Sequence, residues 1–547
     1  MPYQKTQKIL KNRCLWEGVA LLFLLVIYGW FFFHKLAMLP DPNDPLEYIE
    51  PSVWKTFIGG YYPWPDRLMI ADGIRFLSLF FRPELAGEIY FGLISFSIAI
   101  VAIIWAYLKK GFWAAYLVGL FLIISYPLVR YANYGYPDAT VALFGLCAAI
   151  FYLRSQKTQG SLYLAGIFTG LAIFSKITGL AFLLFFVVDL IVSKKYAYLK
   201  PYFVGLITAS AFVLVATGLL FDWASVSYAI KSFGTDISSN TEPRAVLRSI
   251  GNILWPEISL PAYLALIVFI GAYKDKLIKK LFLISWTFIG FFLALFIFSS
   301  HVKVYPHYLY SAYLFASIGM ALYLADLTVR LKNKYFFSLV SLILVFLGFS
   351  LGIRQSNDFD GLKIYYDGLS HYAAPLWLKI SYVAFTLLIV SLMVAIGKLR
   401  QSRLAIVFVV MTSFLGSYFV AGSAMNTIRT QKDAAKVIYA YAQALGEIPK
   451  AQTAIFSNAI DNNNFPKVLW VYRLFVDQKY NRSSRIINQQ EVENDIKQVN
   501  KQDIGHVEWN YIITDNPSAV QTFFPDLKEV KESSDQIYIL TKNAPKS

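Results

Sequence analysis

The sequence predicts an all-α polytopic membrane protein of about 13 transmembrane helices, followed by a small extracytoplasmic α/β C-terminal domain. Three observations predict this class. The 547-residue chain is 57% hydrophobic and only 15% charged, with a mean hydropathy of +0.50. Apolar runs recur along most of the chain, and many are long enough to cross a hydrocarbon core of about 30 Å. Lys and Arg gather in alternate loops between these runs, and a polar segment follows the last one.

The apolar runs give the predicted spans in order. We expect them at residues 15–36, 90–108, 112–129, 139–153, 161–174, 177–193, 201–221, 257–273, 281–299, 308–327, 335–353, 376–397 and 404–423. The first has a basic N-terminal flank, as a signal peptide does. It is too long for one, however, and no small-residue cleavage site follows it, so we interpret it as a retained anchor.

The distribution of charge over the loops predicts the orientation. With the N-terminus in the cytoplasm, every inner loop carries at least two basic residues, whereas acidic residues collect in the outer segments. This pattern predicts a multi-pass protein of the plasma (inner) membrane with an extracytoplasmic C-terminus. Long outer segments are expected at 37–89, 222–256 and 354–375. In the first of these, the amphipathic stretch that begins at Asp72 predicts a helix lying in the membrane interface.

The composition changes near residue 427 and divides the chain into two predicted domains. Residues 1–426 form the expected membrane domain, and 427–547 form a soluble extracytoplasmic α/β domain. In the second domain, 432–445 has helical periodicity, and the apolar runs at 453–457, 468–475, 511–514 and 536–540 predict strands. Its charges nearly balance, so the net charge of +16 lies in the membrane domain. No nucleic-acid-binding motif accompanies that charge, so the expected partner is the lipid bilayer and not nucleic acid.

An acidic cluster directly after the first span is the first candidate for chemistry. It reads Leu39-Pro-Asp41-Pro-Asn-Asp44-Pro-Leu-Glu47-Tyr48. Prolines on both sides of Asp44 keep this backbone extended. A carboxylate held in this way at the membrane surface suits a general base that accepts a proton from a hydroxyl. The alternative reading is a solvated acidic turn.

Two further acidic motifs follow. In the sequence Trp64-Pro-Asp66-Arg67, the guanidinium is a planar donor that can bind phosphate through two hydrogen bonds. The alternative is an aromatic anchor with a structural Asp–Arg pair. The sequence Tyr136-Pro-Asp138 falls in a short outer turn, where Asp138 is a second candidate acid or an N-cap of the next span.

Basic residues at outer span ends are the candidates for binding an anion. Lys176 separates two apolar stretches in Gly170-Leu-Ala-Ile-Phe-Ser-Lys176, where it either offsets a phosphate or extends to the headgroups. A late outer turn contains the set His301, Lys303, Tyr305 and His307. Metal binding by its two histidines is the weaker interpretation, because Pro306 separates them. Near an inner span end, Asp189 is expected to pair with Lys194 or Lys195.

The order of these motifs resembles the GT-C superfamily of membrane glycosyltransferases, in the branch of the protein O-mannosyltransferases and the aminoarabinose transferases. An early acidic motif in the first outer loop (Asp44 to Tyr48) precedes Asp66-Arg67. Tyr136-Pro-Asp138, Gly170-Leu-Ala-x-x-x-Lys176 and the turn from His301 to Tyr310 then follow. The resemblance covers about residues 10–330 and implies a GT-C-like fold. Pro45 stands where the family typically has Glu, so Asp41 remains the rival of Asp44.

The resemblance also implies an activity. The donor would be a polyprenyl-phosphate sugar, and Asp44 would deprotonate an acceptor hydroxyl that attacks the anomeric carbon with inversion. Arg67, Lys176 and the turn with His301, Lys303 and His307 would stabilise the departing phosphate. Asp138 would support the site or help to bind a divalent metal, which the motifs leave open. Substrate-lining residues would be Tyr48, Trp64, Tyr136 and Tyr305.

Other readings predict different features. A lipid-linked saccharide flippase or transporter should line its pathway with polar groups at mid-membrane depth, but these spans are nearly uncharged in their centres. An O-antigen polymerase or ligase usually has its large outer loop late in the chain, whereas here the acidic loop comes first. A wall-polymer-binding module needs far fewer spans for anchoring. The sugar and the acceptor (protein, glycolipid or polysaccharide) stay undefined by the sequence.

Overall fold

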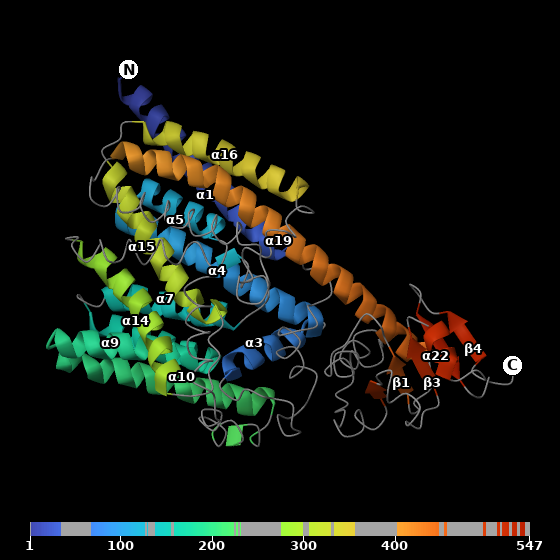
Figure 1. Cartoon of the computed structure of the whole chain (residues 1–547). Coiled ribbons are helices and arrows are strands. Elements are labelled where there is room, and N and C mark those ends of the chain that lie inside the picture. Colours follow the sequence, from blue (N-terminus) through green and yellow to red (C-terminus); the bar gives the residue numbers. More distant parts are fainter. Residues whose placement is uncertain are drawn as a thin grey trace.

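The helical bundle and the small sheet that the sequence predicts are both present in a computed structural model of the chain (Figure 1). The model describes residues 2–33, 67–81, 83–125, 128–129, 137–154, 158–221, 223, 226–227, 230, 275–298, 306–329, 333–355, 402–447, 453–456, 496–498, 511–514, 517–523, 528–532 and 537–541. The predicted spans at 257–273 and 376–397 lie outside this part of the chain.

The helices follow the apolar runs closely. They are α1 (Pro2–Phe33), α3 (Leu68–Ser78), α4 (Pro83–Lys110), α5 (Phe112–Ile124), α7 (Asp138–Arg154), α8 (Gln159–Ser175), α9 (Leu180–Val192), α10 (Leu199–Leu220), α14 (Lys276–Phe298), α15 (Tyr310–Thr328), α16 (Lys334–Arg354) and α19 (Ser402–Glu447). Short 3-10 turns precede three of them, at Ile177–Gly179, Tyr196–Tyr198 and Pro306–Leu309. In the described residues, six helices are long and apolar enough to cross a bilayer, and α5, α8 and α9 are shorter apolar helices. The chain is therefore an integral membrane protein.

Two helices form the centre of the bundle. The side chains of α5 are buried from Phe112 to Ile123, and nearly all of those of α15 are buried as well. Their aromatic residues lock this core: Trp113 stacks on Tyr116 and donates a 2.6 Å hydrogen bond from Nε1 to Thr328 Oγ1. By contrast, α10 and α16 expose large apolar side chains such as Ile207 and Phe346, as lipid-facing helices do.

Helices α8 and α10 pack with their backbones in close approach. A β-carbon added to Gly205 of α10 would lie only 2.0 Å from the carbonyl oxygen of Tyr163 in α8. Small residues at such crossings allow the van der Waals contact that holds helices together where lipid removes the hydrophobic driving force. This contact fixes the position of α8, whose C-terminal end leads to Lys176.

One long helix joins the bundle to the C-terminal domain. Figure 1 shows α19 lying alongside α16 and then extending to the strands. The predicted domain boundary at 426/427 falls inside this continuous helix, so the last span and the predicted helix at 432–445 are one element.

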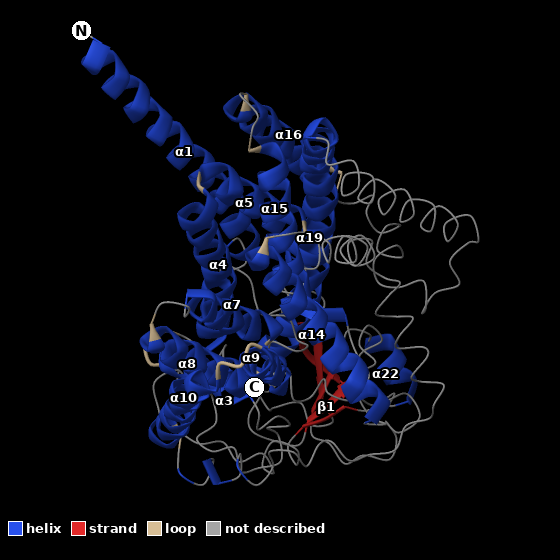
Figure 2. Ribbon diagram, turned by 90° about the vertical axis from the view of Figure 1, so that its left-hand side faces the viewer, coloured by secondary structure: helices blue, strands red, loops and turns tan. Residues whose placement is uncertain are grey.

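The C-terminal domain contains a mixed five-stranded sheet, seen edge-on in red in Figure 2, with strand order β2-β1-β3-β5-β4. Its strands are β1 (Thr453–Phe456), β2 (Ile496–Gln498), β3 (Tyr511–Thr514), β4 (Lys528–Glu532) and β5 (Tyr538–Thr541). Helix α22 (Pro517–Phe523) follows β3 and precedes β4 in the sequence. The β1–β2 and β1–β3 pairs are parallel, whereas β3–β5 and β4–β5 are antiparallel. The α/β class is confirmed, and β1, β3 and β5 match predicted runs. The predicted strand at 468–475 lies outside the described residues.

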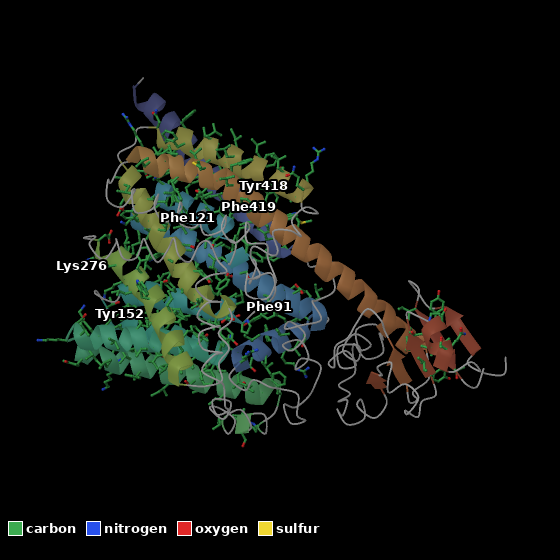
Figure 3. All side chains as sticks on the ribbon, viewed as in Figure 1. Phe91, Phe121, Tyr152, Lys276, Tyr418 and Phe419 are labelled. Carbon is green, nitrogen blue, oxygen red and sulfur yellow. The ribbon has the colours of Figure 1, made fainter. Side chains whose placement is uncertain are left out.

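Ion pairs join the helix ends at the side of the bundle that the loop charges predict to be cytoplasmic. Lys110 Nζ lies 2.7 Å from Asp275 Oδ2 and 2.6 Å from Asp326 Oδ2. Figure 3 shows Lys276, next to this cluster in sequence, and Tyr152 toward one side of the bundle, with Phe91 near α3. Lys110, Asp275 and Asp326 all lie in loops or at span ends that the sequence assigns to the same side of the membrane.

The expected partner of Asp189 was wrong. Its carboxylate accepts hydrogen bonds from Lys280 Nζ, at 2.7 Å, and from the hydroxyl of Tyr152. The backbone turns at Lys194, which has a φ of +55°. Helix α14 packs against α9 and brings Lys280 to Asp189. A pairing between residues 91 positions apart cannot be read from local sequence.

Candidate active site

The structure describes the side chains of three of the predicted site residues, and it brings them together at the other end of the bundle. These are Arg67, Asp138 and Lys176, all of which are buried. The backbone of His307 lies in the 3-10 turn before α15, without a description of its side chain. The rest of the predicted set lies outside the described residues: Asp41, Asp44, Tyr48, Trp64, Tyr136, His301, Lys303 and Tyr305.

Lys176 and Asp138 form a buried ion pair. Nζ of Lys176 donates to both carboxylate oxygens of Asp138, at 2.8 Å to Oδ2 and 3.0 Å to Oδ1. The two side chains are only 6% and 2% exposed. The lysine therefore does not extend to the lipid headgroups, and the carboxylate oxygens that a helix N-cap would use are directed at the ammonium group instead.

Local structure explains why Lys176 points inward. Its backbone is extended (φ −174°, ψ 146°) between the end of α8 and the following 3-10 turn. Asp138 is the first residue of α7. Helices α7 and α8 follow one another in the chain and pack side by side in opposite directions. The end of α8 and the start of α7 therefore meet at the same level, and the two side chains span the gap between them.

An aromatic ring covers the lysine. The ammonium of Lys176 lies 4.0 Å from the ring centroid of Tyr308, in the turn that leads into α15. The ring of Tyr308 stacks in turn on Phe292 of α14. A cation so close to a ring face is attracted by the negative π-surface. The late turn that the sequence singled out thus reaches the ion pair through Tyr308.

Arg67 supplies a second positive charge to this cluster. It is the N-cap residue of α3, it is 7% exposed, and its charge acts on the carboxylate of Asp138. Helix α3 overlaps the amphipathic stretch that the sequence indicated. It buries Leu68, Ile70 and Ile74 against the bundle, and its C-terminal end exposes a cluster of apolar side chains, Phe76, Leu79, Phe80 and Phe81. Those apolar groups are suited to contact lipid.

Asp72 is a buried acidic residue that the sequence motifs did not indicate. This side chain on α3 is 5% exposed and accepts a 2.9 Å hydrogen bond at Oδ2 from Thr217 of α10. Burial, the larger effect, raises the pKa of Asp72 to about 7 and the hydrogen bond from Thr217 opposes this rise only in part. The only local signal was its spacing of four residues from Leu68, at the edge of the apolar face.

The cluster combines two cations, a paired carboxylate and an aromatic ring in a region from which water is largely excluded. Cations in such surroundings stabilise an anion much more strongly than in bulk water. Among the described residues, no group of three or more His, Cys, Asp or Glu side chains is placed to hold a metal ion. The arrangement is therefore suited to binding an anionic group, such as phosphate.

The fold and this cluster define a polytopic membrane protein with a buried charged cluster at one end of its helical bundle. The chain is similar to the crystal structure of ArnT from Cupriavidus metallidurans in the apo state, with a TM-score of 0.54, 15% identity and coverage of 98% of this chain and 99% of that one. ArnT from the same organism bound to undecaprenyl phosphate gives a TM-score of 0.54, 16% identity and 98% coverage of both chains.

A weaker likeness is to the arabinosyltransferase EmbB from Mycobacterium smegmatis. The TM-score is 0.40 at 12% identity, over 78% of this chain and 41% of that one. No family model and no curated protein matches the chain in sequence. The two ArnT structures, at 15% and 16% identity, establish a fold shared with this chain, and this likeness confirms the GT-C-like architecture that the motif order predicted.

Proposed function

We propose that the chain is an inverting glycosyltransferase, which moves a sugar from a polyprenyl-phosphate donor to an acceptor hydroxyl at the outer membrane face. The observation that carries this proposal is the buried cluster of Arg67, Asp138 and Lys176 at the membrane-surface end of a GT-C-like bundle. A similar fold over 98% of the chain is found in ArnT, which has been crystallised with undecaprenyl phosphate.

The cluster suits the leaving group of this reaction. A polyprenyl phosphate leaves as an anion, so its departure needs positive charge and no strong general acid. Arg67 offers a planar set of donors, and Lys176 offers a compact ammonium group. The negative charge of Asp138 offsets part of this positive charge while the site is empty, which reduces the cost of burying two cations. Arriving phosphate would share Lys176 with Asp138.

The proton of the acceptor hydroxyl requires a separate base. We assign this role to Asp44, with Asp41 as the rival, because both belong to the first outer loop, the expected segment 37–89 that also contains Arg67. Asp138 is less suited to it, because both of its oxygens are engaged by Lys176. The hydroxyl would attack the anomeric carbon opposite the phosphate, so the new glycosidic bond forms as the sugar–phosphate bond breaks and the configuration inverts.

The expected surroundings of the site complete the proposal. The turn with His301, Lys303, Tyr305 and His307 would lie beside Tyr308, which contacts Lys176, and would bind the phosphate or the acceptor. Tyr48, Trp64 and Tyr136 would line the groove for the sugar and the lipid chain. The protein would reside in the plasma (inner) membrane, with its N-terminus in the cytoplasm and the C-terminal domain outside. Asp138 and the acidic residues of the first outer loop are the candidate ligands for a divalent metal.

Radiolabelled polyprenyl-phosphate sugars, added to membranes containing the protein, test this proposal. Wild type should release polyprenyl phosphate, and Asp44→Asn should abolish release at matched expression, whereas Asp41→Asn should retain it. Full turnover by Asp44→Asn with loss in Asp41→Asn would transfer the role of base to Asp41. If reconstituted vesicles transported a lipid-linked sugar and no donor were turned over, the proposed function would be that of a flippase and not of a transferase.

A further inference from the structure

We propose that Asp72 is a positioning residue, which as an uncharged acid ties α3 to α10 and so holds Arg67 toward Asp138 and the donor phosphate. The inference rests on the proposed function for the identity of the bound anion. It concerns a buried acidic group that neither the motifs nor the reaction uses. Four structural features carry it: the surroundings of the carboxyl group, the hydrogen bonding of Thr217, the packing of Tyr90 and the place of Arg67 on the same helix.

The surroundings of Asp72 favour its uncharged form. Its side chain is 95% shielded from solvent, and no Lys, Arg or His in the described part of the chain forms an ion pair with it. Only Oδ2 has a hydrogen-bond partner among those residues, and the buried Oδ1 has none. A buried carboxylate without a cation is strongly disfavoured, whereas a protonated acid leaves a single carbonyl oxygen unsatisfied.

The hydroxyl group of Thr217 fits a protonated Asp72. Oγ1 of Thr217 lies 2.9 Å from Asp72 Oδ2 and 3.0 Å from the carbonyl oxygen of Val213. A hydroxyl has only one proton to donate. If Asp72 carries a proton, it donates to Oγ1, and Oγ1 donates to Val213, so both contacts are satisfied in one chain. If Asp72 is ionised, Thr217 must give up one of them.

Tyr90 of α4 closes the other side of this group. Its hydroxyl is buried close to Asp72 and to Thr140 of α7. The ring can lie against α3 only because residue 73 is glycine: a β-carbon there would lie 2.3 Å from the Tyr90 ring. Asp72 is therefore enclosed between α3, α4 and α10, and ionisation would place a charge in this closed space.

Helix α3 transmits this effect to the site because Arg67 is its N-cap residue, five positions before Asp72. Among the described residues, the charged groups on α3 and on the helix ends near it include Arg67 and Arg75 on the helix itself, Glu88 on α4, Lys176 at the end of α8 and Asp138 at the start of α7. Arg75 donates a 3.4 Å hydrogen bond from Nε to the carbonyl oxygen of Leu220 and lies over the ring of Phe221. Ionised Asp72 would disturb the tie of α3 to Thr217 of α10, and Arg67 at the start of the same helix would be held less firmly.

The direction of the pH effect follows from the pKa of Asp72, which burial raises to about 7. Below that value the acid is neutral and the donor phosphate meets only the cations and their partner Asp138. Above it, Asp72 is negative and the affinity for phosphate falls. The phosphate group gains charge over a similar range, which favours binding at high pH, so an Asp72→Asn variant is needed to separate the two effects.

The test measures binding of polyprenyl phosphate to the purified full-length protein at about pH 6 and about pH 8.5. At the higher pH, wild type should bind polyprenyl phosphate several-fold less tightly than Asp72→Asn does. At the lower pH, the two proteins should bind it with similar affinity. Thr217→Val and Asp72→Leu, which break the tie to α10, should weaken binding several-fold at both values. Ser341→Ala, which removes a hydroxyl contact with Ser413 between α16 and α19, is the matched control and should bind as wild type does.

Infrared spectroscopy of the same proteins gives a readout that needs no turnover. Wild type at about pH 6 should show the carbonyl stretch of a protonated carboxylic acid that Asp72→Asn lacks, and the band should disappear as the pH rises. Identical pH dependence of binding in wild type and Asp72→Asn, or absence of that band, would overturn the inference. A persistent pH difference in phosphate binding, without turnover of any donor sugar, would support Asp72 and refute only the transferase.

Discussion

Replacement of Lys176 by Met tests the buried ion pair on which the site is built. Nζ lies 2.8 and 3.0 Å from the two oxygens of Asp138, and both side chains are nearly inaccessible to water. Removing one partner of such a pair leaves an uncompensated buried charge and costs about 3–5 kcal/mol. We therefore expect Lys176→Met to reduce the free energy of unfolding by about that amount and to abolish turnover of the donor.

A second ion pair at the opposite end of the bundle provides the control. Lys280 and Asp189 are equally close, at 2.7 Å, but their side chains are 23% and 19% exposed. Because water can solvate the remaining charge, Lys280→Met should cost only about 1 kcal/mol. It should also leave turnover unchanged, because Lys280 belongs to the ion pairs of the other end. Thermal unfolding of the purified proteins, all in the same detergent, ranks the variants by stability.

A double variant separates stability from catalysis. Lys176→Met with Asp138→Asn removes both charges, so it should be more stable than Lys176→Met alone and still inactive. A Lys176→Met variant that is no less stable than Lys280→Met, or a double variant that regains no stability, would contradict a buried ion pair at this site. Continued turnover by Lys176→Met would refute the phosphate role even if the stability results agree.

Three further outcomes are expected. Arg67→Met should raise the KM for the donor about 10- to 100-fold, as loss of charged hydrogen bonds does, with the fold intact by circular dichroism; an unchanged KM would exclude contact with phosphate. Gly205→Val should cost at least about 1–3 kcal/mol, because its side chain meets the carbonyl oxygen of Tyr163 and not a movable group, and an unaltered melting temperature would contradict the packing. Partial burial alone would raise the pKa of Asp275, but hydrogen bonds from Lys110 and two backbone amides outweigh it, so the pKa falls below its usual 3.8. The stabilisation is then complete above about pH 3.8 and is lost as the pH falls through the lower folded-state pKa, so Asp275→Asn should weaken the acid dependence of thermal stability.

Much of the fold could be predicted from the sequence, because lipid imposes a simple rule. A backbone in hydrocarbon must satisfy its own hydrogen bonds, so each long apolar run becomes a helix. Runs such as 139–153 and 335–353 differ from α7 and α16 by a residue at each end. The amphipathic stretch at Asp72 became α3 for a similar reason, since one of its faces is apolar. The single helix α19 was read as two elements, because hydropathy changes at residue 427 while helical periodicity does not.

The candidate site was predicted less completely. The order of motifs indicated Arg67, Asp138 and Lys176, and the structure places these three side chains in one buried cluster. Whether Lys176 faced the headgroups or the protein was open, since both suit a lysine at a span end. Asp72 escaped notice, because an acidic residue at the edge of an amphipathic face is ordinarily solvated.

The sequence by itself determined the class of this protein: membrane-spanning helices, the side on which their basic loops gather, and a polar α/β domain after them. These depend on hydropathy and charge, which are sums over neighbouring residues. Only the tertiary structure decided which charges meet. Lys176 with Asp138, Asp72 with Thr217 and Lys280 with Asp189 join residues 38, 145 and 91 positions apart. Such pairs are selected by helix packing and burial, because a charge removed from water is stable only where another element brings it a partner.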